Sequence, residues 1–161
     1  AALGSIRPKP YAILLCASGK KFKQRTASFL AKKKSLALIC GHYEGVDARV
    51  EKYVHRIITI GDFILTGGEI PAMAIVDSVA RLIPGSINPK SPVDESFVKA
   101  QLEYPQYTQP RVFNGLKVPQ VLLSGNHAQI AAWRKKQAIK RTKKFRPDLI
   151  KSKSKSKSKS K

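Results

Sequence analysis

The sequence predicts an α/β fold built on a parallel sheet, and two observations lead to this class. Three short segments are predominantly apolar, at 11–15, 35–40 and 56–60. Strands that are apolar on both faces are typical of sheets covered by helices, which is the usual setting of parallel strands. Helical patterns at 24–33, 47–53 and 70–81 alternate with these segments, as a parallel sheet requires for its crossovers.

Each element carries a local signal. The segment 11–15 is aliphatic after its first residue, and 56–60 is rich in β-branched residues, which favour strands. The helix over 70–81 has Pro71 near its first position and Pro84-Gly85 beyond its end, the usual places for these residues.

The second half of the chain has a different character. Six prolines and little periodicity between positions 84 and 119 predict a linker with short ordered pieces. A last helix is expected over 126–144, where Asn126 and Gln129 have the spacing of a capping box and Ile130 and Trp133 share a buried face. The alternating Lys-Ser tail at 151–161 is of low complexity and is expected to be disordered. The expected organisation is therefore a sheet domain at 1–83, the linker at 84–119, a basic helical region at 120–150 and the tail.

Charge indicates the partner. The net charge is +21, and only six of these charges belong to the tail, so about +15 remains on the rest of the chain. Such a body favours a polyanionic partner, because neutralising phosphates drives nucleic-acid binding; a basic pI that serves only solubility is the alternative. The last helix concentrates positive residues at Arg134, Lys135, Lys136, Lys140, Arg141, Lys143 and Lys144.

Other classes receive no support from the sequence. No apolar run approaches the ~18 residues of a membrane span, and the first residues do not resemble a signal peptide. Cys16 and Cys40 are expected to be buried free thiols, without the spacing of a zinc site. A reducing cytoplasm fits this cysteine usage.

Three glycine-bearing loops follow the three strands, at 16–20, 41–45 and 61–68. The carboxyl ends of parallel strands meet at one edge, where ligands of such sheets bind. Glycines there let the backbone approach a ligand closely, although each one alone is also explained by a turn. The sequence has neither the dinucleotide fingerprint nor the P-loop pattern.

Five stretches closely resemble the signatures of the bacterial TrmD-type tRNA (guanine-N1)-methyltransferases, in the family's order and spacing. They are Cys40-Gly-His-Tyr-Glu-Gly-Val-Asp47, Ile60-Gly-Asp-Phe-Ile-Leu-Thr-Gly-Gly-Glu-Ile-Pro71, Asp77-Ser-Val-Ala-Arg-Leu-Ile-Pro-Gly85, Glu103-Tyr-Pro-Gln-Tyr-Thr108 and Val118-Pro-Gln-Val-Leu-Leu-Ser-Gly-Asn-His127. The resemblance implies the SPOUT fold, an α/β sheet with a deep trefoil knot, and a homodimer whose active sites are built from both subunits. The apolar helix at 70–82 is then either part of the dimer surface or plain core.

The resemblance also implies the ligands. S-adenosylmethionine is the methyl donor, and the acceptor is N1 of guanosine 37 in the anticodon stem-loop of tRNA. Magnesium is associated with the family, but the sequence shows no dedicated metal site. By position, the cofactor pocket comprises Leu15, Cys16, Ala17, Gly41, Tyr43, Glu44, Ile60, Gly61, Asp62, Phe63, Ile64, Leu65, Gly67, Gly68 and Pro71.

The chemistry needs a base and a cation. Guanine N1 carries a proton at neutral pH, so a carboxylate must remove it, and a cation stabilises the charge that builds on O6. The family's base maps onto Glu95, with Asp94 as the alternative, and its cation maps onto Arg81. The structural alternatives are a charge at a helix C-terminus for Arg81 and solvated loop acids for the other two.

The chain departs from the family pattern at several points. It is expected to lack the N-terminal segment, Cys16-Ala-Ser-Gly19 replaces Ser-Pro-Gln-Gly, and His42 replaces a common Arg. The expected lack of the N-terminal segment keeps open a catalytically impaired RNA-binding relative. A further alternative is an enzyme that methylates a ribose 2′-hydroxyl, against which the matching Arg81 and Glu95 pair argues. Tyr104, Tyr107 and Phe113 could stack on bases of the anticodon loop or simply pack the small domain.

Overall fold

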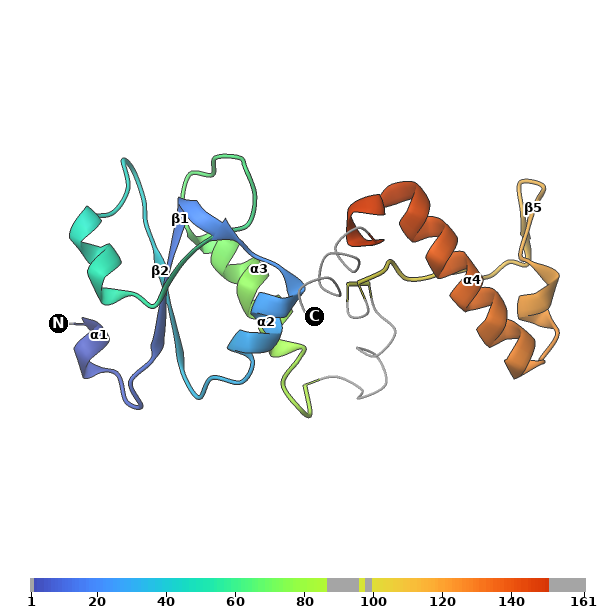
Figure 1. Cartoon of the computed structure of the whole chain (residues 1–161), viewed down its shortest axis with the longest axis horizontal. Helices are drawn as coiled ribbons and strands as arrows, with labels where there is room; N and C mark the ends of the chain where they lie inside the picture. The colour runs from blue at the N-terminus through green and yellow to red at the C-terminus, as the bar shows by residue number, and fades with distance from the viewer. Residues whose placement is uncertain (1, 87–95, 98–99, 151–161) are drawn as a thin grey trace, which may run out of the picture. The chain divides into compact units, whose positions relative to one another are not determined.

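The computed structural model describes residues 2–86, 96–97 and 100–150 (Figure 1). The chain divides into two compact units, Ala1–Pro89 and Lys90–Lys161. Asp94, Glu95 and the Lys-Ser tail, which figured in the sequence predictions, lie outside the described residues. Among the described residues, no helix is long and apolar enough to cross a membrane.

The first unit is built on a three-stranded parallel sheet in the order β2-β1-β3. Its strands are β1 (Tyr11–Lys21), β2 (Leu36–Cys40) and β3 (Arg56–Thr59). Leu15 of β1 lies opposite Cys40 of β2 and Ile58 of β3, so the three strands reach one edge at the same level. The predicted α/β class with a parallel sheet is confirmed.

Two helices cover one face of this sheet, α2 (Gln24–Leu30) and α3 (Glu69–Ala80), and they also contact each other (Figure 1). Side chains alternate between the two faces along a strand. The core accordingly takes alternate positions of β1, and one side of each helix. Its buried members are Ile13, Leu15, Ala27, Leu30, Ile58, Ile75 and Val79.

β1 is longer than the predicted strand and is interrupted. Its pairing with β3 shifts between Leu15 and Lys20, and both of these residues align with Ile58. Residues 16–19 therefore leave the ladder and return to it, instead of ending the strand. Gly19 makes the return possible, because a Cβ at this position would lie 2.5 Å from the backbone of Ile58.

Two short helices complete the first unit. α1 (Ala2–Ser5) was not foreseen, and the helix expected at 47–53 is the 3-10 helix η1 (Ala48–Tyr53). Asp47 caps η1, since its carboxylate accepts a hydrogen bond from the Arg49 amide at 2.8 Å. The guanidinium of Arg49 also donates to this carboxylate, and these bonds lower the pKa of Asp47.

The second unit contains the long helix α4 (His127–Phe145), the 3-10 helix η3 (Gln120–Leu123) and a hairpin of β4 (Val112–Phe113) and β5 (Leu116–Lys117). Asn126 caps α4, because its side-chain oxygen accepts a hydrogen bond from the backbone amide of Gln129 at 3.1 Å. The backbone amide of Asn126 donates a hydrogen bond to Ser124 Oγ at 3.2 Å. In a capping box the Gln129 side chain would accept this hydrogen bond, and here Ser124 accepts it instead.

The segment 100–109 packs along α4. The hydroxyl of Thr142, which is 1% exposed, accepts from the Leu102 amide at 2.9 Å and donates to the Ala138 carbonyl at 2.7 Å. The rings of Tyr107 and Trp133 lie 6.3 Å apart, and Arg134 lies 4.7 Å above the Tyr104 ring. Part of the predicted linker is thus attached to the helix by specific contacts.

Candidate functional site

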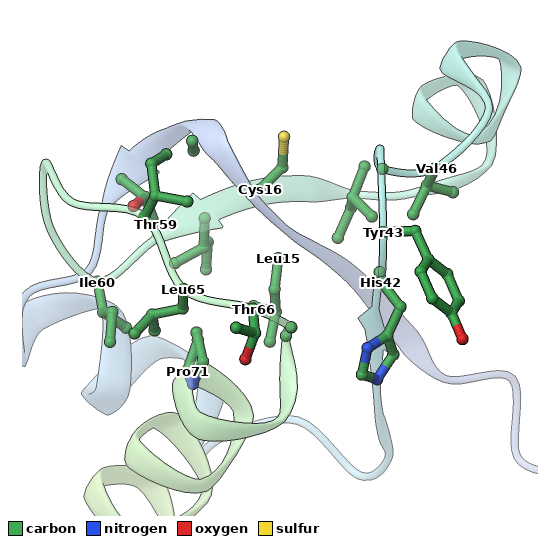
Figure 2. A pocket seen from close by; sticks show the side chains of 18 of the residues that line it. Leu15, Cys16, His42, Tyr43, Val46, Thr59, Ile60, Leu65, Thr66 and Pro71 are labelled. Atoms are coloured by element: carbon green, nitrogen blue, oxygen red, sulfur yellow. The ribbon is translucent and has the colours of Figure 1, made fainter.

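A cavity of about 310 Å³ lies at the carboxyl edge of the sheet (Figure 2). The chain passes from β1 to β2 on one side and then to β3 on the other, so the loops after the strands diverge around β1. This divergence is the topological position at which open parallel sheets bind ligands. In Figure 2, Ile60 and Leu65 lie on one side of the cavity and His42 and Tyr43 on the other.

The second and third loops contact each other beside this cavity. The Gly68 amide donates to the Gly41 carbonyl at 3.1 Å, and His42 forms an isolated bridge with Gly67. A Cβ at Gly68 would lie 2.6 Å from the Cα of Cys40, closer than real Cβ atoms approach. The two loops therefore meet backbone to backbone, and α3 begins directly behind them at Glu69.

The structure brings most of the predicted pocket residues to this one cavity. Those that line it are Leu15, Cys16, Ala17, Gly41, Tyr43, Glu44, Ile60, Phe63, Ile64, Leu65, Gly67, Gly68 and Pro71. Gly61 and Asp62 do not line it. The Thr59 hydroxyl holds Gly61 by donating to its carbonyl at 2.8 Å, and the Asp62 carboxylate accepts from the Lys21 ammonium.

Further residues line the cavity that the sequence did not indicate. They are Leu14, His42, Gly45, Val46, Glu51, Ile58, Thr59 and Thr66. Leu14, Ile58 and Thr59 belong to the strands, and His42, Gly45, Val46 and Thr66 fill gaps within stretches already singled out. Glu51 is different, because it lies on η1 and reaches the cavity only through the fold.

The cavity is acidic in a basic chain. Glu44 and Glu51 line it, and no lysine or arginine is among the described residues that line it. Glu69 is adjacent, since its Oε1 lies 2.7 Å from His42 Nε2. A hydrogen bond from its own amide, and then the contact with His42, lower the pKa of Glu69 and keep it ionised. Such carboxylates favour a ligand with positive charge.

Cys16 is exposed, so the expectation of two buried thiols is wrong for this residue. The reason is that β1 leaves the sheet at Cys16. Its Sγ lies 3.3 Å from the Ser18 hydroxyl, and this hydrogen bond lowers the pKa of the thiol. Cys40 is half-buried, and burial raises its pKa.

Arg81 is the only predicted catalytic residue among the described residues, and it does not line the cavity. Arg81 is exposed at the C-terminus of α3, whereas Pro71 at the other end lines the cavity. At 1.5 Å per residue, the two positions are separated by about 15 Å along the helix. Within the described ranges, no three His, Cys, Asp or Glu side chains are grouped so that they could hold a metal ion.

Comparison with known proteins gives a consistent result. A family described as tRNA (guanine-1)-methyltransferase TrmD matches residues 1–152. A tRNA (guanine-N(1)-)-methyltransferase of Geobacillus kaustophilus is 57% identical over 140 residues, which are 86% of this chain and 57% of that protein. The enzyme of the same name from Bacillus subtilis is 53% identical over 144 residues, covering 88% and 59%. The chain thus spans a little under three-fifths of the length of these relatives.

Proposed function

Because the chain belongs to the tRNA (guanine-1)-methyltransferase TrmD family, we propose that it carries the cofactor site and a tRNA-binding surface of such an enzyme. The proposed reaction transfers the methyl group of S-adenosylmethionine to N1 of guanosine 37, on the 3′ side of the anticodon. The proposed setting is the cytoplasm, where tRNA is processed.

The observation that carries the proposal is the charge of the cavity at the sheet edge. S-adenosylmethionine has a sulfonium and an ammonium group, and the described part of the cavity lining offers Glu44 and Glu51 without a lysine or arginine. Apolar side chains such as Leu65 and Pro71 provide walls for an adenine ring. The volume of about 310 Å³ is at the lower end of the range for small-molecule sites.

In the proposed mechanism, a carboxylate removes the N1 proton of guanine, and an arginine stabilises the charge on O6. Glu95 is the proposed base, with Asp94 as the alternative, and Arg81 is the proposed cation. The sulfonium methyl is already activated, so the protein mainly aligns N1 with it.

A homodimer is part of the proposal. Arg81 is about 15 Å along α3 from the cavity rim, so an Arg81 that acts at the cavity would have to come from a second copy. Ile70, Met73 and Val76 share one side of α3 and are 60%, 71% and 55% exposed. An apolar stripe on a helix beside the cavity supports a contact surface there. The closely packed second and third loops are consistent with the trefoil knot of a SPOUT fold.

The tRNA surface is proposed on α4. Its lysines and arginines are exposed from Arg134 to Lys144, as phosphate contacts require. The anticodon stem-loop is the proposed ligand.

The first test is calorimetric titration of this chain with S-adenosylmethionine, followed by mapping of the methylated atom in tRNA. We expect saturable binding near one per protomer and methylation at guanine N1. Methylation at a ribose 2′-hydroxyl would contradict the assigned reaction. A folded sample that binds RNA but not S-adenosylmethionine would favour the catalytically impaired RNA-binding relative.

The second test addresses the base. Glu95→Gln should lose the methyl-transfer rate and retain S-adenosylmethionine binding, because only the proton acceptor is removed. Asp94→Asn is the matched variant. If the rate falls in Asp94→Asn and not in Glu95→Gln, the base is Asp94.

A further inference from the structure

The second unit contains a cavity of its own, of about 370 Å³. The segment 104–111 forms one wall, and residues of η3 and α4 form the other. Leu122 and Ile130 give it an apolar floor. It is formed by the second unit alone and is separate in sequence from the cofactor cavity.

Two tyrosines line this cavity in fixed positions. The ring of Tyr104 packs under the guanidinium of Arg134 at 4.7 Å. The ring of Tyr107 lies 6.3 Å from that of Trp133, and its side chain is still 46% exposed. A ring held on one side and open on the other is a platform on which a planar group can stack.

The polar groups of the cavity suit a nucleotide. Arg111 and Arg134 line it, and the described residues that line it include no acid. The amides of Gln106 and Gln109 also line it, and the Gln106 amide nitrogen donates to Glu103 at 2.5 Å. That bond leaves the Gln106 carbonyl oxygen as an acceptor for a base edge. Arginines for phosphate, amides for a base edge and an aromatic platform are the elements of single-stranded RNA recognition.

We propose that this cavity binds one unstacked nucleotide of the RNA substrate, with its base on Tyr107 and its phosphate at Arg111 and Arg134. Naming tRNA as the source of that nucleotide rests on the proposed function. Free nucleotides share the same chemistry, so the test must separate the two. The cavity would then add base recognition to the sequence-independent attraction that α4 supplies.

The fluorescence of Trp133 can report whether this cavity is occupied. Trp133 is the only tryptophan, and it contacts Tyr107. Its fluorescence should therefore change when the cavity is occupied. The probes are a synthetic anticodon stem-loop RNA, the same RNA with each loop base removed in turn, and free GMP and AMP.

We expect the stem-loop to change the Trp133 emission. Removal of one particular loop base should abolish this change and weaken binding about tenfold, which corresponds to about 1.4 kcal/mol. Tyr107→Phe should bind like the wild type, and Tyr107→Leu should behave like the base-deleted RNA. Equal binding of all the RNAs would overturn the proposal, and so would free GMP or AMP binding as tightly as the RNA.

A charge-matched pair of variants on α4 separates this cavity from general electrostatics. Arg134→Gln and Lys140→Gln each remove one positive charge from an exposed position, but only Arg134 lines the cavity. Both variants should reduce the salt dependence of the RNA-binding constant by a similar amount. Only Arg134→Gln should also lose discrimination against the base-deleted RNA; equal discrimination in the two variants would refute the assignment.

The outcome is independent of the cofactor site. S-adenosylmethionine binding and methyl transfer are measured on the same samples. Methyl transfer without a Trp133 response would refute nucleotide binding in this cavity and leave the proposed function intact. A base-dependent Trp133 response without methyl transfer would support nucleotide binding in this cavity and contradict the proposed methyl-transfer function.

Discussion

Gly68→Ala tests the contact between the second and third loops. The new Cβ would lie 2.6 Å from the Cα of Cys40 and 2.9 Å from its Cβ, whereas ordinary contacts are 3.4–4 Å. The loops must therefore separate by about 1 Å, and overpacking of this kind costs about 1–3 kcal/mol. Weakening the bond from Gly68 to Gly41 adds about 1 kcal/mol. We expect the free energy of unfolding to fall by about 2–4 kcal/mol.

The same displacement should weaken S-adenosylmethionine binding at least about tenfold, since Gly41 and Gly68 both line the cavity. Denaturant unfolding measures the first effect and calorimetry the second. Gly4→Ala is the control, because no atom lies within 4 Å of its added Cβ and its effect should stay within about 0.5 kcal/mol. If Gly68→Ala matches Gly4→Ala in both assays, the loop contact is not what shapes the cavity.

Other features predict separate outcomes. Cys16 should react with iodoacetamide faster than Cys40 near neutral pH, because its lowered pKa leaves more thiolate. Ser18→Ala should slow the alkylation of Cys16 and shift its pH–rate curve to higher pH, measured by peptide mass spectrometry. An unchanged curve would contradict the role of the Ser18 hydroxyl. Ile75→Ala should lower the free energy of unfolding by about 2–5 kcal/mol, because Ile75 is 0% exposed in the core. Asn126→Ala should cost about 1 kcal/mol by removing the α4 cap, and equal denaturant midpoints for Asn126→Ala and the wild type would argue against that cap.

The sequence predicted the strands and helices of the first unit well because hydrophobic pattern and helix signals agree there. It failed at β1, since the return of the strand after residue 19 depends on Gly19 meeting the backbone of Ile58. No local pattern encodes that approach. The hairpin at 112–117 is different, because Asn114-Gly115 is a recognised turn signal and both residues have positive φ. The prolines on both sides of this turn predicted a linker instead.

For the site, the loops after β2 and β3 were predictable because they follow parallel strands, whereas residues 16–19 form an interruption inside β1. Glu51 was not, because it reaches the cavity from η1, whose position depends on the fold. Gly61 and Asp62 were placed in the pocket by the family resemblance, as part of the run from Ile60 to Leu65. Thr59 and Lys21 hold them elsewhere, and such side-chain partners cannot be read from spacing. The assignment of these residues to S-adenosylmethionine remains a prediction.

The distribution of acids is the strongest remaining argument for two different ligands. The chain has 31 lysines and arginines and only 10 acids, and half of the acids lie between positions 44 and 69. They are Glu44, Asp47, Glu51, Asp62 and Glu69. Three of them are accounted for by local contacts with Arg49, Lys21 and His42, which leaves Glu44 and Glu51 at the cavity. A basic chain whose charge served only solubility does not explain why the described residues that line this cavity include two carboxylates and no lysine or arginine. The two carboxylates at the cavity suit the sulfonium and ammonium groups of the proposed cofactor, whereas the exposed cations of α4 suit the proposed polyanion.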